Sequence, residues 1–497
     1  MKRSLLSITL CAGLMSAYAQ TSLVKDMNPG NAGSFPFRMT AFGNKLVFAA
    51  NDGTNGYELW ARDTSGTNLA FNINPAAASS INYSANRGMA VLGKYVYFPA
   101  ANGSSGTELY RWDGTNPPML AAEIWAGTNG SGIDEVVSMN GKIYFDANDG
   151  SFGEELWVYD TTTNTASRIT DIYTLGSSSI QNITAYRGKI VFAAFNNTSG
   201  TELWSYDPAT NNTVMVSDIE IGASSSSPNN FKVADTTLYF TAYTNTNGRE
   251  LYGYNGTTAT RLTDVVSGFS NSISNTVSGA AMIGNIGGKI YFSGNEASTS
   301  GHLYKYDPSN GLTTLVYKVN PTGNSNITNI LTVKNKIYFS ADNGTVGNEL
   351  WMYNGTGVPV MIADIYKGAI SGSPSDITQM GKNVYFRAAD SANGTELFML
   401  MDSTLSIKNV SFTGNVTVYP NPATADAQME ISLESSQYLH VTLTDMAGRI
   451  IYNNAANYQA GKNNLILPVA NKASGMYIYT VRDDNGQLLT SGRLSKQ

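Results

Sequence analysis

Residues 55–60 read Asn55-Gly56-Tyr57-Glu58-Leu59-Trp60, and the Glu-Leu-aromatic step in this stretch returns along most of the chain. Eight copies follow one another at intervals of 47 to 52 residues. A regular period of this length indicates a repeat architecture. One copy has His302 in place of the acid. The other seven copies carry Glu58, Glu108, Glu155, Glu202, Glu250, Glu349 and Glu396.

Each repeat carries signals for about four short antiparallel strands. A β-branched and aromatic run such as residues 142–145 precedes the acid, and its alternation is typical of a strand with one face buried. Turns rich in Asn, Asp and Gly, such as residues 148–150, separate this run from the Glu-Leu-aromatic strand and favour a hairpin. Four-stranded units of this length, repeated radially, form propeller blades. We therefore predict an all-β chain whose main domain is an eight-bladed β-propeller of four-stranded antiparallel blades, with a parallel β-helix as the alternative.

The two ends of the repeat region compete for the last strand position. Residues 22–27 and residues 405–410 resemble each other and the apolar strand that closes every repeat. Propellers remove exposed edges when one terminus completes the blade that the other terminus builds. We expect residues 22–27 to complete the last blade, and residues 405–410 are the rival.

The chain divides into four segments. Residues 1–19 read as a secretory signal with cleavage between Ala19 and Gln20, and the only cysteine, Cys11, lies inside it. The mature chain therefore has no disulfide and no thiolate site.

Residues 20–403 hold the propeller, 404–414 form a linker, and 415–497 carry alternating strands typical of a small immunoglobulin-like β-sandwich. No later segment is apolar enough for a transmembrane helix, and a pI near 5.1 argues against nucleic-acid binding.

Residues 349–356, Glu-Leu-Trp-Met-Tyr-Asn-Gly-Thr, carry a resemblance to a known family. The repeat resembles the bacterial ELWxxDGT repeat family and departs here only by Asn354 in place of the acid. The resemblance covers about 380 residues and implies an architecture rather than an activity.

The C-terminal segment resembles the type A sorting domain of the type IX secretion system of Bacteroidota. The resemblance implies export through the periplasm, with the translocon and shuttle of that system as partners, and release or attachment at the outer cell surface. The residues that carry it are Pro420, Asn421, Pro422, Gly448 and Gly475.

The repeated acids invite a catalytic interpretation, because paired carboxylates hydrolyse glycosides. A catalytic acid is needed once or twice, whereas these acids recur in seven repeats, so we expect them to accept backbone hydrogen bonds. No catalytic or metal constellation is visible. No cofactor is expected, with calcium at the Asn-Asp-Gly turns as the alternative.

We therefore expect a secreted or surface-displayed, non-enzymatic propeller that binds a glycan or a protein. Trp125 and His302 are the candidate ligand-binding residues, because Trp125 stands outside the repeat pattern and His302 replaces a repeated acid. The alternatives are a polysaccharide hydrolase or lyase that uses the non-repeated acids Glu135, Glu220 or Glu296, and a passive surface scaffold.

Overall fold

The computed structural model describes residues 20–497 except 67, 76–77, 83–87, 269, 274–281, 403–414, 435, 446–448 and 484–487. The expected signal segment with Ala19, the expected linker, the rival strand 405–410 and Gly448 lie outside the described residues. So do residues 83–87 and 274–281, which belong to the connections before β6 and β22. The contacts divide the chain into two units, Met1–Ser403 and Thr404–Gln497, and each is considered by itself.

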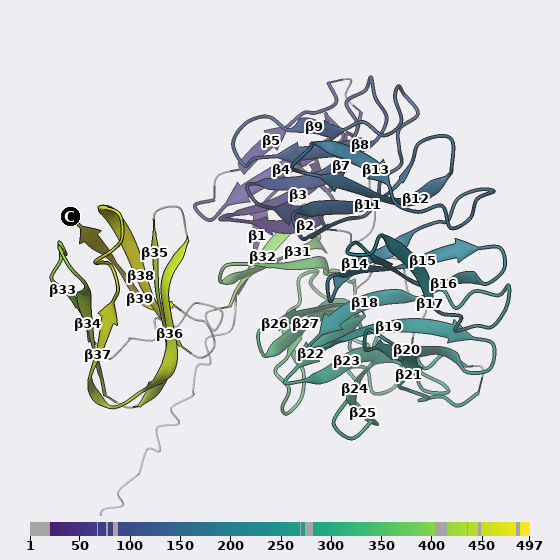
Figure 1. The fold of residues 1–497 in the computed structure, drawn as a ribbon. Helices are drawn as coiled ribbons and strands as arrows, with labels where there is room; N and C mark the ends of the chain where they lie inside the picture. Colours follow the sequence, from purple (N-terminus) through teal and green to yellow (C-terminus); the bar gives the residue numbers. More distant parts are fainter. Residues whose placement is uncertain are drawn as a thin grey trace, which may run out of the picture. The chain divides into compact units, whose positions relative to one another are not determined.

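The first unit is an eight-bladed β-propeller. Its described residues form eight sheets of four antiparallel strands, arranged around a ring (Figure 1). The blades are numbered here in chain order. Blades 1 to 4 consist of β2 (Phe37–Phe42), β3 (Lys45–Asn51), β4 (Tyr57–Asp63), β5 (Asn68–Phe71); β6 (Ala90–Leu92), β7 (Tyr95–Ala100), β8 (Glu108–Trp112), β9 (Met119–Ala122); β10 (Val136–Met139), β11 (Lys142–Asn148), β12 (Glu154–Asp160), β13 (Thr165–Arg168); and β14 (Gln181–Tyr186), β15 (Lys189–Asn196), β16 (Gly200–Asp207), β17 (Asn212–Ser217).

The second half of the ring repeats this order. The first strands of the blades lie at the centre of the ring, where most of them contact the first strand of the next blade, as β2 does with β30. Blades 5 to 8 consist of β18 (Asn229–Ala234), β19 (Thr237–Thr244), β20 (Gly248–Tyr254), β21 (Ala259–Arg261); β22 (Ile283–Ile286), β23 (Lys289–Gly294), β24 (His302–Asp307), β25 (Leu312–Tyr317); β26 (Thr328–Val333), β27 (Lys336–Asp342), β28 (Asn348–Tyr353), β29 (Val360–Ala363); and β30 (Ser375–Met380), β31 (Asn383–Asp390), β32 (Gly394–Met401), β1 (Gln20–Lys25).

The N-terminal strand closes the ring. β1 pairs antiparallel with β32, from Gln20 opposite Met401 to Lys25 opposite Leu397, and becomes the outer strand of blade 8. This confirms the prediction that residues 22–27 complete the last blade. The two ends of the propeller are therefore held in one sheet, and neither edge of blade 8 depends on the linker.

The second strands of the blades are buried on both faces, not on one face as the alternation predicted. In β11, Ile143, Tyr144 and Phe145 are all at most 1% exposed. The reason is that each blade packs between two neighbours, so that both faces of its sheet meet apolar surface. For example, Leu156 of blade 3 packs with Phe192 of blade 4. Apolar burial across the seams between blades therefore stabilises the ring.

The second unit is a small β-sandwich. β33 (Asn415–Tyr419), β34 (Ala427–Leu433) and β37 (Gly461–Leu467) form one sheet. The other sheet consists of β36 (Ile450–Tyr458), β35 (Gln437–Asp445), β38 (Gly475–Asp483) and β39 (Leu488–Lys496). Met429, Ile431, Val441 and Leu443 belong to one apolar cluster between the sheets. The sequence pattern missed β33 and β39. Among the described residues of the chain, no helix has the length and apolarity needed to cross a membrane.

Candidate functional site

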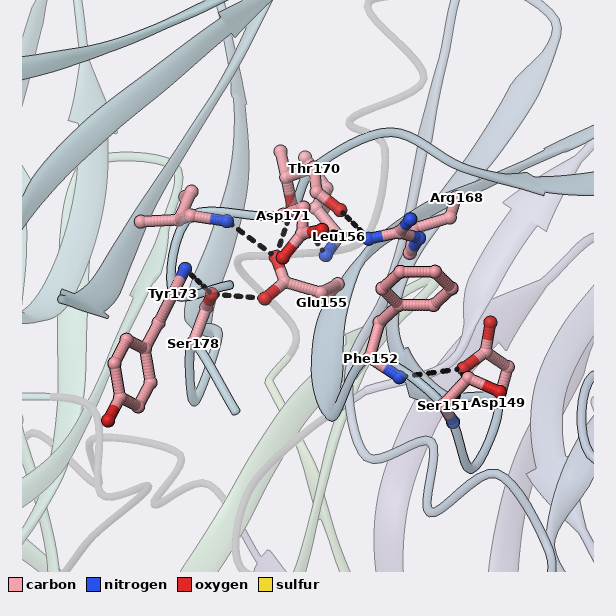
Figure 2. A network of polar contacts seen from close by, with 11 residues as sticks. Asp149, Ser151, Phe152, Glu155, Leu156, Arg168, Thr170, Asp171, Tyr173 and Ser178 are labelled. Carbon is pink, nitrogen blue, oxygen red and sulfur yellow. Dashed lines mark hydrogen bonds and ion pairs between the residues drawn. The ribbon is translucent and has the colours of Figure 1, made fainter. Parts of the chain in front are cut away.

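The repeated glutamates hold the connections between blades. Glu155 at the start of the Glu-Leu-Trp strand accepts hydrogen bonds from the Thr170 hydroxyl at 2.7 Å and the Ile172 amide at 3.3 Å (Figure 2). The Ser178 hydroxyl donates to its other oxygen. All three donors lie on the connection from blade 3 to blade 4. Burial raises the pKa of Glu155, and these hydrogen bonds oppose the rise.

The sequence analysis missed the partner of the acid. A serine 22 to 24 residues after the acid contacts the acid or His302 side chain in six blades, and in blade 8 the partner is Ser34 of the first connection. Blade 7 has Gly372 instead, whose amide donates to Glu349 at 2.8 Å. The contacting pairs are Glu58–Ser80, Glu108–Ser131, Glu155–Ser178, Glu202–Ser226, Glu250–Ser272, His302–Ser325 and Glu396–Ser34.

His302 takes the place of the repeated acid in blade 6. It is fully buried, and its Nδ1 lies 2.7 Å from the hydroxyl of Ser325. The Ser325 hydroxyl also accepts the Asn320 amide at 3.0 Å. Nε2 forms a hydrogen bond with the Thr299 hydroxyl at 2.8 Å. Burial lowers the pKa of His302, which keeps the ring neutral.

Blade 6 departs from other blades at three further positions. Lys318 stands where most other blades have an acid, and its Nζ donates to Glu296 at 2.6 Å. In the hairpin between β23 and β24, Ala297 and Ser300 replace glycines that blade 3 has at Gly150 and Gly153. The chemistry of this blade has therefore changed in its acid, its connection and its hairpin together.

An open groove lies between blades 5 and 6, where their hairpins and connections meet. Its volume is about 680 Å³, and its walls come from the end of β19, the connection before β22, the blade 6 hairpin and the next connection. We call it the seam groove. Its lining residues are Tyr243, Val266, Ser270, Asn271, Asn295, Glu296, Ala297, Ser298, Thr299, Ser300 and Asn324.

The seam groove combines amides, hydroxyls, one carboxylate and a half-buried tyrosine. Asn271 and Asn324 are held by the Arg249 and Ser300 amides, at 2.8 and 2.9 Å. Lys318 fixes the carboxylate of Glu296 and lowers its pKa. The buried imidazole of His302 holds the Thr299 hydroxyl through a hydrogen bond. The groove is therefore a set of held hydrogen-bonding groups beside an aromatic ring.

The other sequence candidates lie outside the seam groove. Trp125 is half-buried, and its indole covers Gly150 so closely that an added Cβ there would come within 2.6 Å. Asn28 and Asn74 cover the hairpin glycines Gly53 and Gly103 in the same way, so Trp125 occupies a repeat position rather than standing outside the pattern.

The non-repeated acids are engaged in separate places. Glu135 accepts the amides of Asn182 and Ile183 at 2.6 and 2.7 Å, which joins blade 3 to blade 4. Glu220 accepts the Asn245 amide at 2.9 Å on the connection to blade 5. Only Glu296 lines the seam groove. The structure therefore does not bring these three carboxylates to one cleft.

A second cluster of charges ties blade 1 to blade 3. Arg38, 2% exposed, donates to the carbonyl of Asp134 at 2.7 Å and to its carboxylate at 2.6 Å. Asp146 accepts the amide of Asp134 at 3.1 Å. Burial, with the charges of Asp146 and Asp134, raises the pKa of Glu154 to about 7. These groups hold the connection between blades 2 and 3, because the oxygens of Asp134 accept hydrogen bonds from the Arg38 guanidinium and Asp146 accepts one from a backbone amide.

No group of three or more His, Cys, Asp or Glu side chains gathers as a metal site in the described part of the chain. In the first Asn-Asp-Gly turn, Asp52 instead accepts the amides of Thr54 and Asn55 at 2.9 and 2.8 Å. Turn formation accounts for the acid at this position.

In the second unit, Asn421 clamps the last strand. Its side-chain amide donates to the Arg493 carbonyl at 2.7 Å, and its oxygen accepts the Ser495 amide at 2.9 Å. Pro420 and Pro422 flank it, and both follow cis peptide bonds. Gly475 begins β38.

Residues 417–491 match the family model described as the secretion system C-terminal sorting domain. The C-terminal unit is therefore a type IX sorting domain, and the protein is exported to the cell surface or beyond it. No curated protein matches the chain.

Solved structures similar to the chain include a puromycin hydrolase, with 13% identity, 84% of this chain and 61% of that chain covered, and a TM-score of 0.45. A puromycin-hydrolysing peptidase of Mycobacterium tuberculosis shows 10% identity, coverages of 84% and 61%, and a TM-score of 0.46. TolB of Acinetobacter baumannii shows 11% identity, with 73% of this chain and 78% of that chain covered, and a TM-score of 0.30. The chain thus covers about three fifths of the length of the puromycin hydrolase and of the Mycobacterium tuberculosis peptidase.

Proposed function

We propose that this exported propeller is a carbohydrate-binding protein and that its ligand lies in the seam groove. The observation that carries the proposal is the set of fixed amide, hydroxyl and carboxylate groups beside Tyr243 in an open groove of about 680 Å³. Sugar hydroxyls both donate and accept hydrogen bonds, which amides and hydroxyls match. A tyrosine ring offers apolar surface to a sugar face.

The repeat itself provides an internal comparison. Seven other blades build the same fold with an acid at the His302 position and a glycine at the Ser300 position, and Lys318 is the one basic residue at its position in the eight repeats. The fold does not need these changes, so we attribute them to the ligand. His302 contributes by holding Thr299, and does not itself contact the ligand because it is fully buried.

Binding is favoured over hydrolysis. Glycoside hydrolysis needs two carboxyl groups about 5–10 Å apart across the bond. Among the described residues that line the seam groove, Glu296 is the one carboxylate, and its salt bridge to Lys318 keeps it ionised. It is suited to accept sugar hydroxyls rather than to donate a proton.

The test screens the purified full chain on an array of glycans and assays the same glycans for cleavage products. The proposal predicts binding without products, and Glu296→Gln weakens binding because a neutral amide accepts weaker hydrogen bonds. Lys367→Gln, on another connection, is the control. Cleavage products would favour a hydrolase or lyase, and an empty array would leave a protein ligand or a scaffold.

We also infer that the eight repeats belong to the ELWxxDGT repeat family of Bacteroidota. The repeated Glu-Leu-aromatic strand, with its recurrent turn residues, supports the assignment, and the type IX sorting domain supports the bacterial group. The translocon and shuttle of the secretion system are then the partners of residues 415–497.

A further inference from the structure

Blade 5 places two cations without counter-charges in the seam that it shares with blade 6. Arg249 is 7% exposed, and its Nη1 donates only to neutral acceptors, the Ser227 carbonyl at 3.1 Å and the carbonyl and hydroxyl of Thr241 at 3.4 and 3.3 Å. Its Nε is buried without a partner. Lys232, half-buried on β18, forms no ion pair or hydrogen bond with any described residue.

The two side chains project from one face of the blade 5 sheet. On β18 and β19, Lys232 pairs with Tyr239, and Tyr239 lies two residues before Thr241. Thr241 in turn pairs with Leu251 of β20, which lies two residues after Arg249. Residues paired across antiparallel strands, and residues two apart, share a face. Tyr239 and Leu251 pack against Ile283 and Phe292 of blade 6, so this face is the one toward the seam.

Among the described residues, no carboxylate forms an ion pair or hydrogen bond with either cation. Burial alone lowers the pKa of Lys232 and of Arg249, with no contribution from a charged neighbour. Residues 274–281, which precede β22, contain no acidic residue in their sequence. At the position of Lys232, other blades have the neutral residues Thr40, Val137, Thr184, Leu331 and Thr378. A buried cation without a partner destabilises a fold, and the other blades show that the fold does not require it.

We propose that Arg249 and Lys232 bind the negative groups of an acidic polysaccharide, carboxylates or sulfates, at the seam between blades 5 and 6. The guanidinium is suited to these groups because its planar fork offers parallel hydrogen-bond donors. Ser227, whose carbonyl accepts from the guanidinium, lies five positions before Lys232 along the chain. A chain with several negative groups can therefore contact both cations.

This inference rests on the proposed function and names the class of its ligand. The backbone amide of Arg249 donates to Asn271, a lining residue of the seam groove, so the start of β20 that carries the guanidinium adjoins the groove. A free inorganic anion has the same chemistry, and the experiment separates the two sources.

The experiment titrates the full chain with short oligomers of polygalacturonate and of dextran sulfate, and with uncharged dextran. The variants Arg249→Met and Lys232→Met remove each charge and keep aliphatic bulk, and Lys382→Met is an exposed control. We expect each seam variant to bind at least one acidic oligomer about tenfold more weakly, the effect of one charged contact. Lys382→Met binds like the wild type.

A second measurement keeps folding and binding apart. Without ligand, both seam variants melt at or above the wild-type temperature, because an unpaired buried charge has been removed. Sodium sulfate, compared with sodium chloride at equal ionic strength, raises the melting temperature of the wild type more than that of the variants.

The results distinguish failure of this inference from failure of the proposed function. Unchanged affinity of the seam variants for acidic oligomers, or binding of uncharged dextran only, overturns the inference and leaves carbohydrate binding intact. No binding of any glycan, together with sulfate stabilisation confined to the wild type, rejects the polysaccharide in favour of a free anion and removes the proposed function. Equal sulfate effects in all chains with no glycan binding remove both.

Discussion

The hydroxyl of Ser34 donates a 2.5 Å hydrogen bond to the carboxylate of Glu396, which joins the first connection of the propeller to its last blade. Glu396 also accepts the amides of Met27 and Asn28, both at 3.3 Å. The repeated acid therefore has an added role in blade 8, because its partners come from the opposite end of the chain. Ring closure depends on β1 and on this carboxylate together.

Glu396→Ala is expected to lower the free energy of unfolding by about 2–4 kcal/mol, because two buried donors and one partly buried donor lose their acceptor. Ser34→Ala removes one donor and keeps the carboxylate satisfied by the two amides, so about 1 kcal/mol is expected. Urea unfolding of the full chain measures both. Equal stability of wild type and Glu396→Ala would show that the ring closes through strand pairing alone.

His302→Ala is expected to destabilise the chain by about 2–4 kcal/mol, since it empties a fully buried site and leaves the hydroxyls of Thr299 and Ser325 without their partner. His302→Glu restores the residue of the other blades and recovers most of this loss. It should nevertheless weaken glycan binding, because Thr299 loses its hydrogen bond to the imidazole. A His302→Glu chain that binds like the wild type would separate His302 from the seam groove.

Glu154→Gln tests the charge cluster between blades 1 and 3. The pKa of Glu154 is raised to about 7, so the folded state holds a proton that the unfolded state releases near its ordinary value of 4.5. The contribution of Glu154 to stability is therefore full below pH 4.5 and is lost as the pH rises through 7. Relative to the wild type, the variant should gain about 1–3 kcal/mol between pH 5 and pH 8. Thermal unfolding at the two pH values measures the gain, with the exposed Glu123→Gln as control; a gain that does not change with pH would contradict the assignment.

Asn421→Ala removes both hydrogen bonds that clamp β39 in the sorting domain. We expect a loss of about 1–3 kcal/mol in that domain, with the propeller unaffected, and accumulation of the protein in the periplasm. Cell fractionation measures the export, and Asn457→Ala, on another strand of the same domain, is the control. Normal export of an unfolded domain would show that recognition needs only the linear motif.

Much of the fold was predictable because repetition amplifies weak local signals. A single run such as residues 142–145 is ambiguous, whereas eight repeats at intervals of 47 to 52 residues define the blade and its four strands. The match of residues 22–27 to the closing strand of each repeat also predicted how the ring closes. The burial of both faces was missed, because alternation within one strand carries no information about a second blade that covers the other face.

The candidate site was only partly predictable. His302 was singled out as a departure from the repeat, and the structure adds the reason it matters, namely its contact to Thr299. Trp125 was misread because the alignment of short motifs did not reach the residue after the apolar closing strand, where Asn28 and Asn74 have the same position. Arg249 and Lys232 gave no signal at all, since a missing counter-charge becomes visible only when strands distant in sequence are placed together.

The most direct test of carbohydrate binding in the seam groove compares the affinity of the wild-type chain and of Tyr243→Ala for the best ligand of the glycan array, by calorimetric titration. Tyr366→Ala, a half-buried tyrosine on another connection, serves as the matched control. Loss of the ring from the groove is expected to weaken binding by about 1–2 kcal/mol, or roughly tenfold, while the control stays at the wild-type value. Equal affinities for all three chains would contradict the seam groove as the binding site.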